Sequence, residues 1–283
     1  MKILFLLISI SLYAFSPQKI FPIISVGDGK TVLSIYKASK ISQKLNNEIV
    51  DYWKKLSPKK ELESFRLPDG LRSKTLNSLG VYLEDQVFIY NMKLNQVENR
   101  KLKELSDLRV YMNLAADGLI GVIGFPLQIE GLNAKHALAS LSKKNPFEQG
   151  LVKRVQWQKS SQKKFNFKDL PDEKTKSTVQ NFQFFENGIK LYHTHIKRDH
   201  QNGYVDEKFG LLVISSSGDQ KKIMGETSYD YFPKIIYTGK LFKEAGEVFY
   251  SESTGMGNCG HLYYQDKNRK WQNIELNCGV WGC

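Results

Sequence analysis

Two histidines separated by one residue, His193 and His195, are the best candidates for metal ligands in the sequence. Residues two apart on a β-strand point to the same face, so both imidazoles can reach one zinc or copper ion. The absence of an H-E-x-x-H motif excludes a standard metalloprotease. The alternative, which we favour, is a solvent-facing strand rich in His and Thr. The pair is therefore a hypothesis for a metal site, and we expect no cofactor.

A second motif, the segment 27–31 (GDGKT), ends like a phosphate-binding loop. Such a loop has the form G-x-x-x-x-G-K-[ST], and its first glycine lies five positions before the second. Here that position is Ile24, so the glycine-rich backbone that would surround the phosphates is incomplete. We therefore expect no nucleotide partner.

The motifs of acyl-transferring hydrolases are missing or incomplete. No G-x-S-x-G elbow occurs, and the S-x-x-K matches lack the S-D-N and K-T-G companions of penicillin-binding enzymes. A glycosidase needs only two well-placed carboxylates, and Glu84, Asp85, Glu226 and Asp230 are available. No pair among them stands out. An extracytoplasmic hydrolase acting on cell-wall glycan or a similar polymer therefore stays the alternative function.

The range 143–177 is polar and basic, with aromatic residues among its lysines. Cations beside exposed aromatic rings suit an anionic polymer or an anionic membrane surface. In the alternative interpretation, the rings anchor a lysine-rich loop or linker to the core. The candidate partner-binding residues are Lys153, Arg154, Trp157, Lys159, Lys163 and Lys164.

The composition agrees with an anionic partner. The 283 residues carry a formal net charge of +12, which attracts nucleic acid, anionic lipid, wall polymers or acidic glycans. Lysine greatly outnumbers arginine, and this favours an unspecific positive surface over bidentate recognition of phosphate. The alternative is a charge that serves solubility alone. The apolar content of 41% is ordinary for a globular chain and excludes wholesale disorder.

The first residues predict export. Met1 and Lys2 precede the apolar stretch Ile3–Phe15, which is shorter than the roughly 20 residues of a membrane span. Ala14 and Ser16 are the small residues of a cleavage site, so residues 1–16 are the expected signal peptide, with a cut after Ala14 as the second choice. A buried strand or an uncleaved anchor is the alternative. We expect a soluble bacterial protein, periplasmic or secreted, without a later membrane span.

Three cysteines, Cys259, Cys278 and Cys283, lie near the end of the sequence. In an oxidising compartment cysteines pair where geometry allows. If the segments before and after the polar turn 267–270 form a hairpin with Asp266 opposite Trp271, Cys259 faces Cys278 at a distance near disulfide reach. We therefore predict a Cys259–Cys278 disulfide, with Cys278–Cys283 as the competing pair.

The elements that position these residues are mostly strands. One amphipathic helix is predicted, because apolar residues recur at spacings of three and four up to Ser57-Pro58. The segment 68–70 (PDG) predicts a turn, and Ala134–Leu141 predicts a short helix. Strands are expected at 80–92, 109–114 and 119–125, and hairpins at 87–102, 211–224 and 261–276.

These patterns predict a mainly β fold with antiparallel strands and one or two short helices. The hairpin spacing favours a β-propeller-like arrangement, and a β-sandwich or an α+β fold is the alternative. The expected organisation is a signal peptide at 1–16, a mixed β/α portion at 17–142, a basic excursion or linker at 143–177, and an all-β portion at 178–283. The leading function is an exported binding or structural protein that contacts an anionic partner.

Overall fold

The computed structural model describes a mainly β protein with antiparallel sheets and two α-helices. The described residues are 19–27, 30–105, 107–114, 119–148, 152–155, 158–159, 175–184, 190–199, 205–214, 220–222, 233–243, 248–253, 260–265 and 271–276. The predicted signal peptide and the three cysteines lie outside these ranges. For the strands between residues 158 and 236, the backbone alone is described.

The N-terminal part forms an eight-stranded sheet in the order β3-β6-β7-β2-β1-β8-β4-β5, and all neighbouring strands are antiparallel. Strand β1 joins its two halves, because residues 20–22 pair with β8 and residues 23–26 pair with β2. The strands are β1 (Ile20–Val26), β2 (Lys30–Ser34), β3 (Ser64–Arg66), β4 (Gln86–Asn91), β5 (Gln96–Lys101), β6 (Arg109–Asn113), β7 (Leu119–Leu127) and β8 (Ala137–Ser142).

The predicted amphipathic helix is confirmed as α1 (Gln43–Leu56). The Ser42 side chain caps its start by accepting a hydrogen bond from the Leu45 N–H at 3.2 Å. Leu45, Ile49 and Trp53 lie on one side and are buried against the sheet. The helix ends before Pro58, as the sequence predicts. Short 3₁₀ turns lie at η3 (Ala38–Lys40), η4 (Leu102–Glu104) and η6 (Ala134–His136).

Two sequence predictions of local structure are wrong. The predicted turn at 68–70 is instead the start of a second helix, α2 (Asp69–Leu79), which ends at Gly80 with φ of 66°. The predicted helix Ala134–Leu141 is instead a 3₁₀ turn followed by β8. Strand β8 is apolar at consecutive positions because both of its faces are buried, and such a run looks alike in a strand and in a helix.

A second sheet packs against the outer face of the first. Its order is β18-β17-β16-β15-β9, again antiparallel. The shared core takes Ile20, Phe88, Tyr90 and Leu138 from the first sheet and is completed by residues of the second sheet and its loops. The second-sheet strands are β9 (Val152–Arg154), β15 (Pro233–Gly239), β16 (Val248–Ser253), β17 (Gly260–Gln265) and β18 (Trp271–Leu276).

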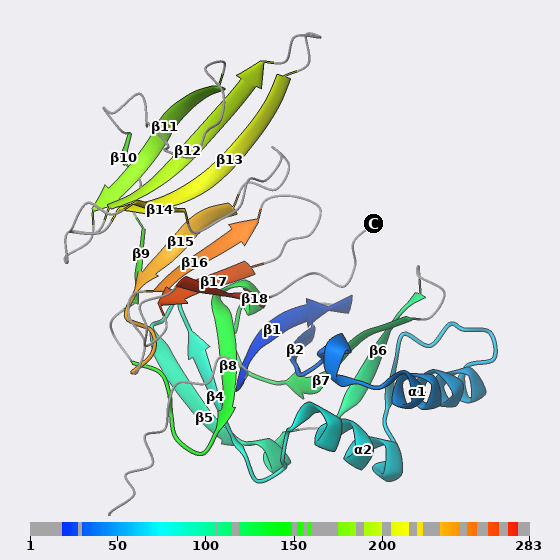
Figure 1. Cartoon of the computed structure of the whole chain (residues 1–283). Coiled ribbons are helices and arrows are strands. Elements are labelled where there is room, and N and C mark those ends of the chain that lie inside the picture. The colour runs from blue at the N-terminus through cyan, green and yellow to red at the C-terminus, as the bar shows by residue number, and fades with distance from the viewer. Residues whose placement is uncertain are drawn as a thin grey trace, which may run out of the picture.

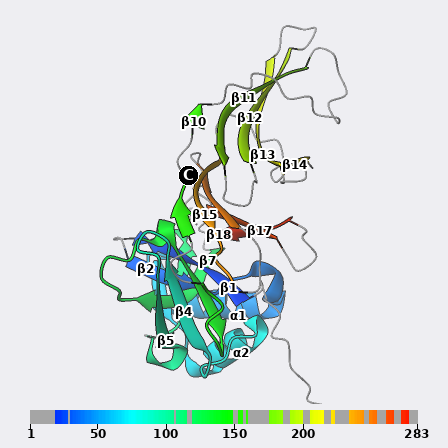
Figure 2. The same ribbon diagram turned by 90° about the vertical axis from the view of Figure 1, so that its left-hand side faces the viewer.

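A third sheet stands apart from the others. Figures 1 and 2 both show it beyond the second sheet, on the side away from the helices. Its order is β10-β11-β12-β13-β14, and its three long strands pair antiparallel over most of their length. The strands are β10 (Gln158–Lys159), β11 (Thr175–Phe184), β12 (Lys190–Asp199), β13 (Val205–Ile214) and β14 (Gln220–Lys222).

The three predicted hairpins are confirmed as β4–β5, β13–β14 and β17–β18, one in each sheet. The described strands form open sheets and no closed ring, so the structure does not show a propeller. A β-sandwich or an α+β arrangement is compatible with the helices on one face of the first sheet and the second sheet on the other. The range 143–177 contains β9, β10 and the start of β11, and its role as a linker stays a prediction.

Gly124 on β7 provides a test of the packing between β7 and β2. A Cβ added there would collide with the Leu33 carbonyl oxygen and lie 2.5 Å from Val32 Cγ1. Because backbone atoms cannot move away cheaply, we expect Gly124→Ala to lower the free energy of unfolding by about 3 kcal/mol, the upper end of the usual cost of overpacking. The matched control is Gly70→Ala, whose Cβ meets nothing within 4 Å in α2. It should change stability by at most about 1 kcal/mol, in the stabilising direction. Equal midpoints for both variants in urea unfolding would contradict this packing.

Tyr90 makes the shared core sensitive to alkaline pH. Burial raises the pKa of its phenol from 10.0 to about 12. Below pH 10 the hydroxyl is neutral in both states, whereas between pH 10 and 12 the unfolded chain loses the proton first. The folded state should therefore lose stability across that window. We expect Tyr90→Phe to show a smaller loss in urea unfolding there, and a constant offset from the parent below pH 10. Parallel curves throughout would refute the assignment.

Candidate functional site

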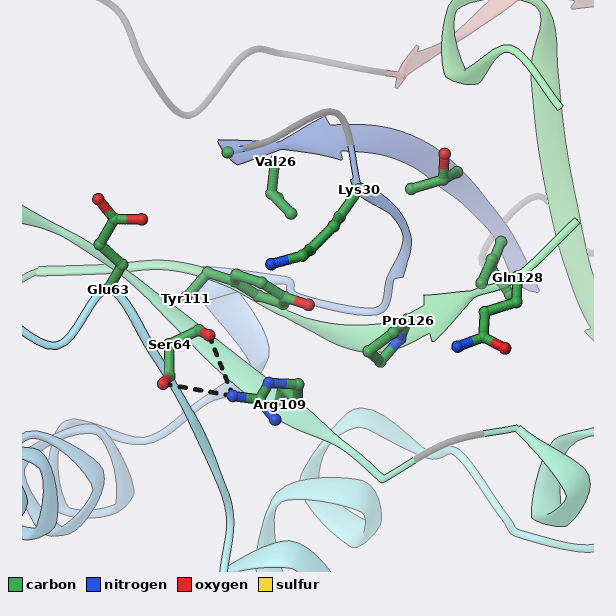
Figure 3. Close-up of a pocket in the computed structure, with 11 residues that line it drawn as sticks. Val26, Lys30, Glu63, Ser64, Arg109, Tyr111, Pro126 and Gln128 are labelled. Atoms are coloured by element: carbon green, nitrogen blue, oxygen red, sulfur yellow. Dashed lines mark hydrogen bonds between the residues drawn. The ribbon is translucent and has the colours of Figure 1, made fainter. Parts of the chain in front are cut away.

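The described residues form a cleft of about 390 Å³ at one end of the eight-stranded sheet. It lies where β1, β2, β6 and β7 meet the chain entering β3. Figure 3 shows Lys30 reaching toward the ring of Tyr111, with Arg109 and Ser64 on the other side of that ring. Glu63 lies at one end of the view, and Gln128 at the other. The remaining lining residues are Val26, Gly27, Thr31, Pro126 and Leu127.

Strand pairing brings the polar residues of the cleft together. Val26 pairs with Lys30, and Ser64 pairs with Tyr111. Arg109 and Tyr111 are two apart on β6, so they share the outer face, whereas Val110 between them is buried in the core beneath the helices. The alternation of β6 therefore gives the cleft one cation and one phenol.

Hydrogen bonds fix the base of the cleft. One terminal nitrogen of Arg109 (Nη2) donates to Ser64 Oγ at 3.1 Å and to the Ser64 carbonyl oxygen at 3.4 Å. The Met112 N–H donates to the Glu63 carbonyl oxygen at 2.8 Å. A Cβ at Gly27 would lie 3.5 Å from Glu63 Oε2, which shows that this carboxylate is close to the Gly27 backbone. The lining residues of β3 and β6 are therefore held in one arrangement.

Tyr111 is a largely buried residue of the cleft that carries a hydroxyl group. Only 7% of the residue is exposed. Burial raises the pKa of its phenol, and the positive charge of Arg109 lowers it by a smaller amount. At neutral pH the hydroxyl is therefore protonated and can donate a hydrogen bond. Together with Lys30, Arg109 and the Gln128 amide, it gives the cleft several donors suited to an anionic group.

The described lining contains a single carboxylate, Glu63. Hydrolysis by a carboxylate pair needs two such groups, so this cleft by itself supplies binding groups and not that pair. Of the predicted carboxylates, Asp85 is buried, and its Oδ2 accepts a hydrogen bond from the Tyr82 N–H at 3.2 Å. Glu84 precedes it in the same turn. Glu226 and Asp230 lie outside the described residues.

The predicted metal pair lies on β12, the central strand of the third sheet. The backbone of His193 pairs with Asn181 and Leu211, and that of His195 with Thr178 and Phe209. Within the described part of the chain, no group of three or more His, Cys, Asp or Glu residues is arranged to hold a metal ion. The pair stays a prediction.

The predicted basic partner-binding residues are spread over two sheets. Lys153 and Arg154 lie on β9, at the edge of the second sheet, and Arg154 is exposed. Lys159 lies on β10, at the edge of the third sheet. Trp157, Lys163 and Lys164 lie outside the described residues. Their role in binding a partner stays a prediction.

The register predicted for the terminal hairpin is wrong by one residue. Gln265 pairs with Trp271, and Gly260 pairs with Leu276. The connection between the strands is therefore one residue longer than predicted, and Asp266 belongs to it. In this register Cys259 and Cys278 are no longer expected directly opposite one another. Both cysteines lie outside the described residues, so their disulfide stays a prediction without its register argument.

Sequence reasoning did not identify the cleft. In the sequence, Lys30 belongs only to the incomplete nucleotide-binding motif at 27–31. Arg109 and Ser64 belong to no motif. Their proximity arises from the pairing of β3 with β6 and of β2 with β7. A pattern read along the chain does not contain that information.

No family model, curated protein or solved structure matches the chain. Among the described residues, no helix is both long and apolar enough to cross a membrane.

The electrostatic influence of Arg109 on Tyr111 gives a titration test. Because the Arg109 charge lowers the pKa of the Tyr111 phenol, Arg109→Gln should raise that pKa further. The Tyr111 signal is isolated by subtracting the tyrosinate absorbance of Tyr111→Phe in each background. Lys103→Gln, in the 3₁₀ turn η4 and outside the cleft lining, should leave the Tyr111 titration curve unchanged. A Tyr111 pKa that falls or stays constant in Arg109→Gln would disprove the proximity.

Proposed function

We propose that the protein is an exported binding protein whose cleft holds an anionic group of a partner molecule. The supporting observation is the convergence of Lys30 and Arg109, from two different strands, on one cleft that also contains the Tyr111 hydroxyl. Phosphate and carboxylate are the anions that such donors recognise. We further propose that the protein acts outside the cytosol, in the periplasm or as a secreted protein, where wall polymers and lipid head groups carry these anions.

The arrangement of Arg109 supports recognition of an anion. Its hydrogen bonds to Ser64 use Nη2 alone. A guanidinium has five N–H donors, so donors are left to bind an anion while its orientation is held. Lys30 supplies a compact positive charge from the other side of the cleft. A guanidinium fork and an ammonium together offer donors in two different geometries to one anion.

Glu63 restricts which anions fit. Its carboxylate lies near Gly27, at one end of the cleft. It repels a second negative charge at that end and accepts hydrogen bonds from hydroxyl or amine groups. The cleft therefore favours an anion that is followed by neutral or cationic polar groups over a densely charged polyanion.

The test is calorimetric titration with inorganic phosphate and with a glycerol-phosphate polymer. We expect Lys30→Gln/Arg109→Gln to weaken binding of either probe by at least about a hundredfold, because each of the two charged hydrogen bonds contributes roughly 1.5–3 kcal/mol. A matched control, Lys93→Gln/Lys103→Gln, removes the same charge elsewhere and should retain the parent affinity at fixed ionic strength.

Glu63→Gln provides a second comparison in the same titration. Removing the negative charge should strengthen phosphate binding, because the variant keeps the donors and loses the repulsion. The proposal fails if the double variant binds as tightly as the control, or if no probe binds to the parent chain at low ionic strength.

A further inference from the structure

The loop that follows α1 combines exposed cations with exposed apolar side chains. We define the 54–62 loop as the last three residues of α1 together with the loop after it, Lys54 to Leu62 (KKLSPKKEL). Its four lysines and one glutamate give it a net charge of +3. Leu56 is 48% exposed and Leu62 is 38% exposed, and all four lysines are exposed. Figure 1 shows the C-terminal end of α1 and this loop at the rim of the molecule.

Hydrogen bonds with two buried side chains hold the 54–62 loop in one conformation. The buried Ser57 Oγ accepts hydrogen bonds from the N–H groups of Glu61 at 3.0 Å and Leu62 at 3.1 Å. The Trp53 ring nitrogen, in the core, donates to the Leu62 carbonyl oxygen at 2.9 Å. A fixed loop loses little conformational entropy when a partner binds, so its affinity is not reduced by ordering.

Lys60 adds a further sign of a constrained loop. Its φ of 58° lies in the left-handed region, which a lysine rarely occupies. The Lys60 N–H donates to the Ser57 carbonyl oxygen at 2.8 Å, and this bond helps to keep the tight turn. The turn presents Lys59 and Lys60 to solvent.

The lysines of the loop have few acidic neighbours. Lys54 lies 3.9 Å from Asp51, with both side chains exposed, and such a pair is weak. Within the described part of the chain, Lys55, Lys59 and Lys60 form no ion pair. Their charge is therefore directed at solvent and at whatever approaches the loop.

We propose that the 54–62 loop docks on an anionic lipid surface. A lipid surface is the partner that uses both features: its head groups attract the lysines, and its interfacial region takes up the leucines. A soluble polyanion would use the lysines and leave the leucines in water. The proposal goes beyond the anion-binding cleft and involves neither Lys30 nor Arg109, so it stands or falls without them.

The test is co-sedimentation of the full chain with vesicles of phosphatidylcholine, with and without phosphatidylglycerol. Each lysine near an anionic surface raises the partition coefficient roughly fivefold. We expect the variant Lys55→Gln/Lys59→Gln/Lys60→Asn to bind anionic vesicles about a hundredfold more weakly. Asn is chosen at position 60 because it tolerates a positive φ. All variants share residues 1–16, so any vesicle binding by that segment cancels in the comparison.

The leucines separate a lipid surface from other anionic partners. Leu56→Ser/Leu62→Ser keeps every charge and should still weaken vesicle binding at least about tenfold. Far-ultraviolet circular dichroism shows whether each variant is folded. If the leucine variant misfolds, the charge variant alone decides the outcome. The matched control is Lys93→Gln/Lys101→Gln/Lys103→Gln/Leu94→Ser, which removes three exposed lysines and an exposed leucine elsewhere. It should bind like the parent.

Three results would overturn the proposal. The first is equal vesicle binding by the loop variants and the control. The second is a leucine variant that folds and binds like the parent while the lysine variant does not, which would indicate a site for soluble polyanions. The third is equal binding to vesicles with and without phosphatidylglycerol. None of these outcomes depends on phosphate binding in the cleft, so the two proposals fail separately.

Discussion

The structure depends on a group of strands that are buried on both faces. In β4 and β8, successive residues alternate between two cores: Val87 and Ile89 pack with the helices, whereas Phe88 and Leu138 pack with the second sheet. A strand buried on both faces fixes its register twice, because a slip of one residue would exchange the contents of both cores. These strands therefore hold the helices on one side and β15–β17 on the other.

The cleft exists because the outer face of the first sheet is divided. At the β4–β8 end that face belongs to the core shared with the second sheet. At the β2–β6–β7 end it forms a separate small cluster that includes Ile24, Val32 and Tyr111 and contains no residue of the second sheet. Polar residues at the margin of that cluster, such as Lys30 and Arg109, line the cleft. These residues stand on the eight-stranded sheet, and side chains on regular strands keep a fixed arrangement better than side chains on loops.

The sequence correctly predicted those elements whose pattern of apolar and polar residues fits only one kind of secondary structure. The spacing of Leu45, Ile49 and Trp53 is helical, and the polar turns marked the hairpins. Helix α2 escaped prediction because its only buried residues are Thr75, Leu76 and Leu79, which is too few to form a clear stripe. Strand β8 was mistaken for a helix because its two buried faces erase the alternation. The register of the terminal hairpin was predicted wrongly by one residue, because the polar residues between the two strands do not show where each strand ends. The cleft was missed because strand pairing alone assembles it.

The cleft and the 54–62 loop are connected directly by the chain. Leu62 is followed by Glu63 and Ser64, which line the cleft, and the Met112 N–H fixes Glu63 to β6. Two residues span at most about 7 Å, so the two features are close neighbours. A surface that contacts Leu62 therefore lies near the Glu63 end of the cleft. An anion that approaches the donors from that end meets the Glu63 carboxylate, which would favour zwitterionic or hydroxylated head groups over densely charged ones. Under the two proposals, Glu63 would therefore connect the docking segment with the selectivity of the cleft.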